Sequence, residues 1–474
     1  MYNIMHLSQQ DLLTGLMAIT IIATVLFCIE FTVKYKWLNK LFGRKLLHFT
    51  SICTCAWAIN RFENRLFLAY TFLLFFFILL GVIKKGWMQV NDYKTYGIAF
   101  FPLAFALLLF IPAFSNFVIV YAVLILGISD ALAGICGEYF GRQKIIFLFE
   151  KKSWIGFAAF YFSALVISLF YFNEWTLNRT LFCLLLSLLP AITELFSYRG
   201  SDNFSVPLFT AIWALLILNF DFYQLQLLWL AIILFATLAA FAQYKKWLTV
   251  SGAIAACWVA LLLYVSGGYK AFVAPGIFLI SGSLLSKLNK PQKEKEGRNA
   301  IQVFANGITG IVFMLLYGVT QQNIYLITAL VSFAISMSDS TSSELGVYCK
   351  GATFDILSFK KTPVGLSGGI SLQGTIAGLA GAMVIGAAAM YCYHLSIPIF
   401  IWITVGGFTG MLADSILGSW LQLQYKTADG TVSDDPLADA KKLKGFNWCT
   451  NDTVNIMSNI LITLLFFYIF KQIH

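Results

Sequence analysis

Long apolar stretches recur along the whole chain, separated by short polar segments that carry most of the charges. A helix needs about 20 apolar residues to cross the hydrocarbon core of a bilayer, and most of the stretches approach that length. The pattern predicts an all-α polytopic membrane protein of about 16 transmembrane helices. No basic segment and no small-residue cleavage site precede the first stretch, so we expect it to remain as a first membrane helix. The expected spans cover residues 12–33, 46–60, 66–83, 97–113, 116–136, 154–172, 180–196, 206–219, 226–243, 247–265, 271–286, 299–318, 324–337, 367–392, 397–421 and 453–470.

The polar segments alternate between rich and poor in basic residues. With the N-terminus outside, 27 of the 32 Lys and Arg residues fall in loops on the inner side and 5 on the outer side. Cytoplasmic loops of membrane proteins carry an excess of Lys and Arg, and a missed helix would scramble this alternation. The layout therefore predicts a multi-pass protein with both termini outside and with its candidate active sites at the cytoplasmic face. In a bacterium the membrane would be the inner, or plasma, membrane.

Composition supports a membrane protein and narrows the function. The chain is 59% hydrophobic and 11% charged, whereas typical soluble domains are about 25% charged. The net charge of +10 fits basic residues that flank membrane spans, so we expect no nucleic-acid partner. The nine Cys residues form no Cys-x-x-Cys motif and no cluster with His. Neither a disulfide framework nor a zinc site is therefore indicated.

One motif occurs twice, 209 residues apart. "SDALAGICGEY" begins at Ser129, and "SDSTSSELGVY" begins at Ser338. The alignment continues without a gap to "KKSWIG" at 151–156 over "KKTPVG" at 360–365. Both segments begin where an expected span meets the cytoplasm.

Other segments repeat in the same order. "GRKLLHF" at 43–49 resembles "GRNAIQV" at 297–303, and each opens an expected span. We interpret the chain as a tandem duplication of an eight-helix unit, with one domain at 1–225 and the other at 226–474. An even number of spans separates the two motifs, so the repeats are predicted to be parallel.

Each half places an aspartate after a long apolar run, Asp130 in the first and Asp339 in the second. A charge at such a position is costly unless it serves a pathway, a pair or a ligand. Carboxylates suit Mg²⁺ beside substrate phosphates, and basic side chains and backbone N–H groups suit phosphate oxygens. Phosphoryl transfer needs mainly positioning and charge neutralisation. The pattern favours a kinase or another nucleotide-using transferase whose acceptor dissolves its apolar part in the bilayer.

Two common nucleotide-binding loops are missing from the sequence. It has no Gly-x-x-x-x-Gly-Lys-Ser/Thr motif and no glycine-rich loop of the protein-kinase type. A nucleotide site in this chain would have to be of another type.

The first half resembles the membrane-embedded polyprenol kinases, such as phytol kinase and dolichol kinase. The resemblance covers most of residues 35–220 and rests on "GRKLLHF", "GISDALAGICGEYFGR", "KKSWIG" and "ELFSYRGSDNFSVPL". The second half, about 227–474, resembles the family typified by plant phytyl-phosphate kinase. Its motifs are "GRNAIQVFANG", "SMSDSTSSELG", "KKTPVGLSGGISLQGT", "GFTGMLADSILGS" and "TNDTVN".

Together the resemblances imply a fusion of two consecutive kinases. The first unit would phosphorylate a prenyl alcohol of the phytol or geranylgeraniol type to the monophosphate. The second would phosphorylate that prenyl monophosphate to the diphosphate. The resemblance implies CTP as the phosphoryl donor and Mg²⁺ as the cofactor. The lipid monophosphate would not have to leave the bilayer between the two steps.

Position by position, the resemblance also implies site residues. The catalytic acids would be Asp130, Asp339, Glu344 and Asp414. The metal ligands would be Asp130, Glu194, Asp202, Asp339 and Asp414. The nucleotide or phosphate would be bound by Arg44, His48, Gly134, Gly137, Lys152, Ser153, Gly156, Asn203, Arg298, Gln302, Asn306, Ser343, Lys361, Gly365, Gly368, Gly369, Asn451 and Asn455.

Some of these residues have a purely structural alternative. His48 is also compatible with an interfacial histidine beside a basic cluster. Glu344 is compatible with a structural ion pair to Lys350 or Arg298. The small residues of "SGGISLQG" at 367–374 suit close helix packing as well as a backbone cradle for phosphate.

Two other functions fit the same pattern. One is a lipid cytidylyltransferase, which also uses CTP, Mg²⁺ and a lipid phosphate. The other is a transporter of a lipid or small molecule with parallel repeats.

The first half departs from the polyprenol kinases at Ser129, where they commonly have Gly, and at Ile155, where they commonly have Glu.

Overall fold

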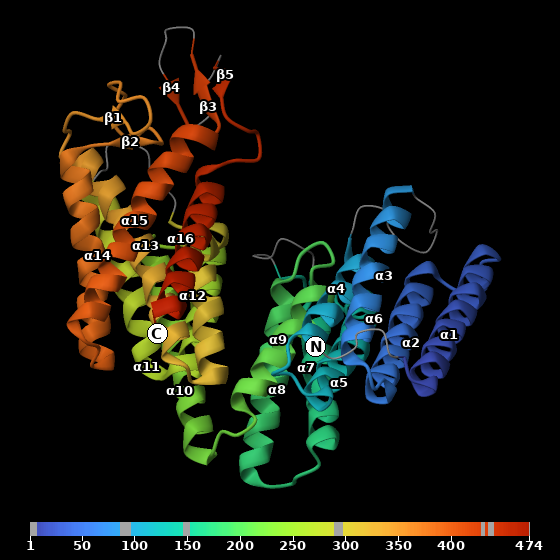
Figure 1. Cartoon of the computed structure of the whole chain (residues 1–474). Helices are drawn as coiled ribbons and strands as arrows, with labels where there is room; N and C mark the ends of the chain where they lie inside the picture. Colours follow the sequence, from blue (N-terminus) through green and yellow to red (C-terminus); the bar gives the residue numbers. More distant parts are fainter. Residues whose placement is uncertain are drawn as a thin grey trace. The chain divides into compact units, whose positions relative to one another are not determined.

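The computed structural model describes residues 7–85, 96–145, 152–288, 297–427, 432–434 and 440–473. Most of the described chain is helical (Figure 1). Twelve of the described helices are long and apolar enough to cross a membrane. The chain is thus an all-α polytopic membrane protein, as predicted. Two further apolar helices, Gly97–Phe110 and Asp202–Ile217, are shorter than the roughly 20 residues of a full span, and the number of sixteen spans stays a prediction.

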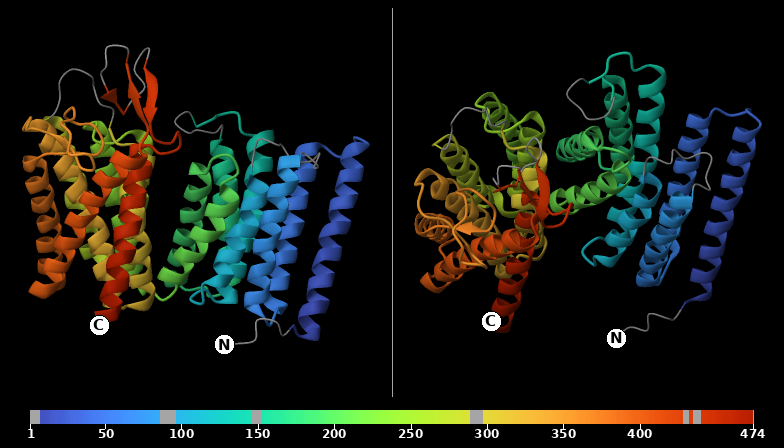
Figure 2. Two further views of the ribbon diagram at one scale, coloured as in Figure 1. Left: turned by 45° about the horizontal axis from the view of Figure 1, so that its top comes forward. Right: turned by 90° about the horizontal axis from the view of Figure 1, so that it is seen from above.

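Two compact units make up the chain, residues 1–227 and 228–474. Within each unit the helices run side by side (Figure 2). The first unit contains, in chain order, α1 (Gln9–Lys34), α2 (Lys40–Arg61), α3 (Arg65–Lys85), α4 (Gly97–Phe110), α5 (Asn116–Leu124), the π-helix η1 (Ile125–Asp130), α6 (Ala131–Tyr139), α7 (Trp154–Phe172), α8 (Leu177–Phe196) and α9 (Asp202–Ile217).

The second unit begins within α10 and adds two small sheets to its helices. Its helices are α10 (Phe222–Tyr244), α11 (Val250–Leu288), α12 (Ala300–Thr320), α13 (Asn323–Tyr348), α14 (Leu372–Tyr393), α15 (Ile397–Leu421) and α16 (Asn451–Ile473). Its strands are β1 (Phe354–Asp355), β2 (Gly369–Ile370), β3 (Gln424–Lys426), β4 (Val432–Ser433) and β5 (Lys441–Lys444).

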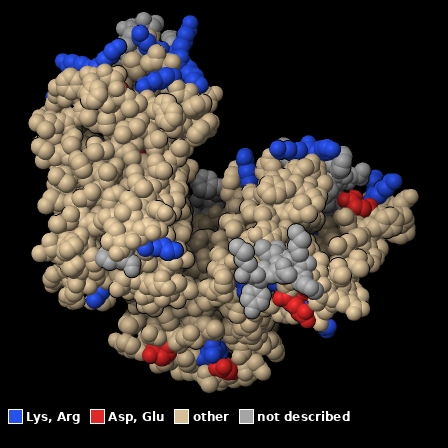
Figure 3. All heavy atoms as spheres, in the orientation of Figure 1, with Lys and Arg blue, Asp and Glu red and all other residues tan. Residues whose placement is uncertain are grey.

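The strands form short antiparallel ladders at one end of the second unit. β1 pairs with β2, and β3 lies between β4 and β5. Lys and Arg side chains gather over this end of the unit (Figure 3). It is the end that the charge pattern predicts to face the cytoplasm.

The helix α11 contains two of the expected spans and folds back on itself. Its helical conformation is interrupted at Gly267 and at Gly268, whose φ of 67° suits glycine. Gly252, near the start of α11, and Gly282, near its end, both lie against Arg298. Gly252 meets the backbone of Arg298 and Gly282 meets its side chain, so two residues 30 positions apart reach the same residue because the two halves of α11 form a hairpin.

The most buried helix of each unit carries the repeated aspartate. The segment 116–139 comprises α5, η1 and α6, and 72% of its apolar 18-residue stretch is buried. For the corresponding stretch of α13 the share is 78%. The outer helix α1 has only 11% buried. α2, α7 and α9 pack around the first central helix, and α12, α14, α15 and α16 pack around α13. Asp130 and Asp339 are therefore held inside helix bundles rather than on lipid-facing surfaces.

Arg65, the first residue of α3, closes the end of α4. Its guanidinium donates hydrogen bonds of 2.5 to 2.7 Å to the carbonyl oxygens of Leu108, Leu109, Ile111 and Phe114. The last carbonyls of a helix have no partner within the helix. A single side chain thus satisfies the end of α4 and joins it to α3.

Candidate active sites

Three carboxylates that the sequence proposes as metal ligands meet in the first unit. Asp130 ends η1, Glu194 lies in the last turn of α8, and Asp202 is the first residue of α9. One carboxylate oxygen from each lies within 4.8 Å of the other two. Asp130 and Glu194 are buried, and Asp202 is partly buried. Three oxygen ligands at this spacing fit the donor set that Mg²⁺ prefers.

The π-helical turn η1 helps to position Asp130. A π-turn widens the helix locally and is often found at functional sites. A Cβ at Gly127, within η1, would lie 2.6 Å from Cγ2 of Ile52, so the absence of a side chain lets α2 approach closely. This approach brings the basic residues at the start of α2 to Asp130.

Two cations and a histidine surround these acids. Lys45 Nζ lies 2.8 Å from Asp130 Oδ2, and His48 Nε2 lies 3.5 Å from the same oxygen. Lys152 Nζ donates a short hydrogen bond to Glu194 Oε1. Burial disfavours the charge of Lys152, but the carboxylates of Glu194, Asp202 and Asp130 together outweigh burial and raise the pKa of Lys152. The first unit thus combines carboxylates for a metal with cations for phosphate oxygens.

Lys45 was not among the predicted site residues, whereas its neighbour Arg44 was. Arg44 makes no ion pair with any carboxylate of the described chain. Residues three or four apart share a helix face. Arg44 lies four residues before His48 and Lys45 lies three before it, so the sequence spacing did not show which of the two is at the site. Gly134 does: a Cβ there would lie 2.8 Å from Lys45 Nζ, which shows that the lysine crosses α6 at this glycine to reach Asp130.

Gly137, Ser153 and Gly156 bring α6 and α7 together. Ser153 Oγ caps α7 by accepting a hydrogen bond of 3.1 Å from Gly156 N. A Cβ at Gly137 would lie 3.4 Å from the Cα of Gly156, so the two backbones are almost in contact. These residues set the position of the α7 start, and hence of Lys152, against Glu194. Lys151 of the same motif lies outside the described residues.

Asn203 joins two helices of the first unit. Its Nδ2 donates a 2.9 Å hydrogen bond to the carbonyl oxygen of Gly97, at the start of α4. Its Oδ1 is buried and has no hydrogen-bond partner in the described structure. Asn203 therefore holds α9, and with it Asp202, in place.

In the second unit, Arg298 faces two acids of α13. Arg298 precedes α12, and its guanidinium interacts electrostatically with Glu344 and Asp339. Burial lowers the pKa of Arg298, while these two carboxylates act in the opposite direction. Glu344 Oε1 also accepts a 2.6 Å hydrogen bond from Ser286 Oγ on α11. This position is compatible with both interpretations of Glu344: a structural ion pair with Arg298 and a role in catalysis.

Asp414 of α15 lies near enough to Asp339 for their charges to repel. Its Oδ1 accepts a 2.8 Å hydrogen bond from Ser458 Oγ on α16. The Asn455 amide, turned to donate, lies 3.1 Å from the same oxygen. In the described chain, the three acids of this unit do not form a group as close as that of the first unit.

The structure corrects the ungapped alignment of "KKSWIG" with "KKTPVG". A Cβ at Gly346, the counterpart of Gly137, would lie 3.4 Å from Gly374 Cα and 3.4 Å from Ser371 Oγ. Ser371 caps α14 by accepting a hydrogen bond from Gly374 N, as Ser153 caps α7. Ser371 and Gly374, rather than Thr362 and Gly365, therefore take the places of Ser153 and Gly156.

The predicted phosphate cradle of the second unit belongs to a loop that packs on protein. Lys361 is exposed, Gly365 and Gly368 have φ of 84° and 83°, and Gly369 pairs within the β1–β2 ladder. Gly368 packs against Ser419 at the end of α15. In the same loop, Ser367 N donates a 2.9 Å hydrogen bond to Asp434 Oδ2. The positive-φ glycines shape this loop, and a carboxylate already accepts the Ser367 N–H.

The remaining predicted residues have different surroundings. Gln302 forms a capping box with Asn299 at the start of α12, and Asn306 Nδ2 donates to Gln302 O at 2.9 Å. Ser343 and Asn451 are exposed. Of these four predicted residues, Gln302 and Asn306 line a cavity together with Arg298.

Comparison with known proteins identifies the second unit. Residues 233–463 match the family described as "Integral membrane protein DUF92". The chain is also 31% identical over 197 residues to "Uncharacterized membrane protein MJ0933" of Methanocaldococcus jannaschii, across 40% of this chain and 82% of that protein. The chain belongs to the DUF92 family.

This DUF92 protein is also similar to two proteins of Arabidopsis thaliana. It is 28% identical over 280 residues to "Protein PGR", across 51% of the chain and 95% of PGR. It is 25% identical over 224 residues to "Protein VTE6, chloroplastic", across 44% of the chain and 62% of VTE6. No solved structure matches the DUF92 protein.

Proposed function

We propose that this DUF92 protein is a membrane-embedded prenyl phosphate kinase. Its second unit would phosphorylate a prenyl monophosphate to the diphosphate. The motifs of that unit resemble the phytyl-phosphate kinase family, and the similarity to VTE6 supports the proposal. The observation that carries it is the partly buried Arg298, whose charge interacts with Glu344 and Asp339, because this places a cation for phosphate near carboxylates for a metal.

For the first unit we propose phosphorylation of the prenyl alcohol itself. Asp130, Glu194 and Asp202 offer the oxygen ligands for Mg²⁺, while Lys45 and Lys152 lie beside them with positive charge. The apolar chain of the alcohol would stay in the bilayer, and its head would reach the acids at the predicted cytoplasmic face. CTP is the proposed donor at both sites.

The two proposed steps differ in the group that accepts the phosphoryl group. In the first, the prenyl hydroxyl oxygen forms a bond to the γ-phosphorus of CTP while the bond from that phosphorus to the departing CDP oxygen breaks. The hydroxyl proton passes to a carboxylate of the Asp130 group. In the second, an oxygen of the lipid phosphate attacks, and no hydroxyl proton has to be removed. Mg²⁺, held by Asp130, Glu194 and Asp202 or by Asp339 and Asp414, would neutralise the charge of the donor phosphates.

Labelled CTP tests this function in membranes that contain the protein. With γ-labelled CTP and geranylgeraniol, we expect label in the prenyl mono- and diphosphate. Asp130→Asn should lower monophosphate formation about 100-fold, since it removes a charge from the reacting centre, and should leave the second step intact. Asp339→Asn should make the monophosphate accumulate.

Asp221→Asn is the matched control, because Asp221 is exposed and its role in accepting a hydrogen bond from Gln224 N is one that Asn also fulfils. Transfer of α-label into lipid would show a cytidylyltransferase instead. Transfer of neither label would leave a transporter as the better explanation.

A further inference from the structure

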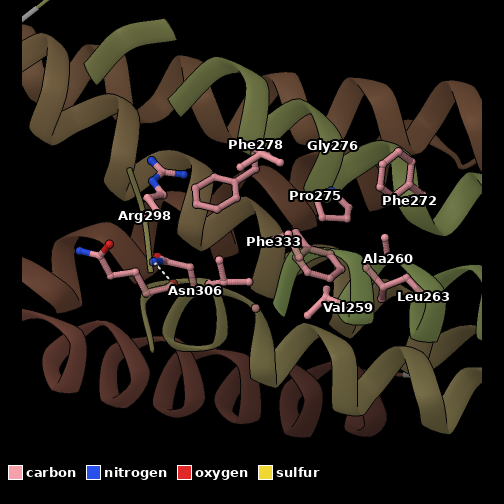
Figure 4. Close-up of a pocket in the computed structure, with 15 residues that line it drawn as sticks. Val259, Ala260, Leu263, Phe272, Pro275, Gly276, Phe278, Arg298, Asn306 and Phe333 are labelled. Carbon is pink, nitrogen blue, oxygen red and sulfur yellow. Dashed lines mark hydrogen bonds between the residues drawn. The ribbon is translucent and has the colours of Figure 1, made fainter. Parts of the chain in front are cut away.

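A cavity lies inside the second unit, between the two halves of the α11 hairpin, α12 and α13 (Figure 4). The centre of a water molecule could reach about 70 Å³ of it. Val259 lines it from the first half of α11 and Pro275 from the second. Asn306 comes from α12 and Phe333 from α13. Most of the side chains that line it are apolar.

The cavity is elongated and its two ends differ chemically. Arg298 and Asn306 lie at one end, and Leu263 and Phe272 lie at the other (Figure 4). On the second half of α11, the residues that line the cavity run from Phe272 to Leu279. At 1.5 Å per residue, the cavity follows this helix for about 10 Å.

At the polar end, Arg298 has hydrogen-bonding capacity left over. Its NH1 is buried and has no hydrogen-bond partner in the described structure. The guanidinium carbon lies 4.8 Å from the ring centroid of Phe278, so the aromatic ring holds the fork in place. A guanidinium stays charged when buried, and its fork matches the oxygens of a phosphate.

Small residues leave the rest of the cavity open. A Cβ at Gly276 would meet nothing nearer than 3.6 Å, and one at Gly307 nothing nearer than 3.5 Å. These are ordinary van der Waals distances, so the glycines are not required for the close approach of two helices. Their effect, together with that of Ala260, is to keep space free along the hairpin.

We propose that this cavity binds the isoprenyl chain of a lipid monophosphate, with the phosphate at Arg298 and the chain end against Phe272 and Leu263. One apolar channel with one phosphate-binding group fits a lipid of a single chain better than a two-chain phospholipid. This inference rests on the proposed function and extends it, because the Phe272 end of the cavity would limit the length of chain that the site accepts.

Filling the apolar end tests the inference through chain length. In Ala260→Phe, we expect the ratio of kcat/KM for geranylgeranyl phosphate to that for geranyl phosphate to fall at least about tenfold, as when a hydrophobic pocket loses room for methylene groups. Phe272→Ala should shift the ratio in the opposite direction. Ala240→Phe, on the exposed face of α10, makes the same change outside the cavity and should leave the ratio unchanged. An unchanged ratio in both cavity variants would overturn the inference while leaving the kinase function in place.

Continued turnover of geranyl phosphate shows that Ala260→Phe is folded. If the variant does not fold, Ala260→Leu makes a smaller change at the same position and tests the same expectation.

A binding experiment separates the cavity from the reaction. A geranylgeranyl monophosphate with a photoreactive diazirine at its chain end should label residues between 259 and 276 of the full-length protein. Arg298→Gln should reduce labelling by this probe several-fold but not labelling by the corresponding photoreactive alcohol. Labelling of residues that do not line the cavity would overturn the cavity assignment even if CTP-dependent phosphorylation occurs. Labelling inside it without any phosphorylation would keep the cavity and refute the kinase.

Discussion

Lys152 and Glu194 form an ion pair that is largely shielded from solvent, with exposed side-chain fractions of 17% and 7%. Taking both charges from water is costly, and their attraction repays this only while both are present. The same reasoning applies to Lys45 and Asp130, at 14% and 8%. Asp130 and Glu194 therefore each depend on one lysine for their stability as buried charges.

Removing Lys152 should destabilise the protein. In Lys152→Met, the Glu194 carboxylate stays buried without its cation, and we expect a loss of about 3–5 kcal/mol in the free energy of unfolding. The double variant Lys152→Met, Glu194→Gln should recover most of this loss, because no uncompensated charge remains. Denaturant unfolding of the detergent-solubilised protein measures both. Equal losses in the single and double variants would contradict the pairing.

The acids were found from sequence more readily than the cations. Asp130 and Asp339 follow long apolar runs, and such a position marks a charge as unusual. The partner of Asp130 depends on how α2 turns about its axis, which Gly127 and Gly134 decide by allowing close approach. Helical spacing alone left Arg44 and Lys45 equivalent.

At the scale of elements, hydropathy predicted the membrane helices, because burial in lipid or protein demands apolar side chains over a full span. It did not predict how the loop before α14 is built. The alignment placed Lys361 and Gly365 at the site, whereas the chain uses that stretch to connect β1 to β2 and caps α14 later, at Ser371. Identical residue types in a loop and at a helix start cannot be told apart without the contacts.

This loop should detach from α15 at low pH. Asp355 accepts hydrogen bonds from Ser419 Oγ at 2.5 Å and from Ser358 N at 2.7 Å. Burial acts to raise the pKa of Asp355, but these hydrogen bonds outweigh it and lower the pKa. A depressed pKa contributes stability that is present above the unfolded value of about 3.9 and is lost as the pH falls through the folded value.

Hydrogen exchange of residues 353–370 measures the detachment. Relative to the intrinsic exchange rate at each pH, we expect strong protection at neutral pH and weaker protection below about pH 4. Asp355→Asn should exchange faster already at neutral pH and should lose the acid dependence. Unchanged protection in this variant would show that other contacts hold the loop.

At the scale of the whole molecule, each unit has its own central helix and its own acids. The two compact units meet in sequence between residues 227 and 228, within α10. The segment 218–221 links α9 to α10. Two units that fold separately would each keep its reaction when the chain is opened there.

Coexpression of residues 1–221 and 222–474 as separate chains tests this independence. We expect the second chain alone to phosphorylate geranylgeranyl phosphate, and the pair to convert the alcohol to the diphosphate. Product analysis with γ-labelled CTP provides the measurement, with the intact chain as control. If the separate chains insert into the membrane but only the intact chain is active, the two reactions depend on each other.

Arg65 affects how the basic residues on each predicted side of the membrane are counted. It is one of the five basic residues assigned to the outer side, yet its guanidinium is taken up by four carbonyl oxygens at the end of α4. Arg179, another of the five, pairs with Glu174 at 3.0 Å. Neither is a free surface charge in the folded protein. In the folded protein, the predicted outer side therefore carries fewer free positive charges than the raw count of 27 to 5 indicates.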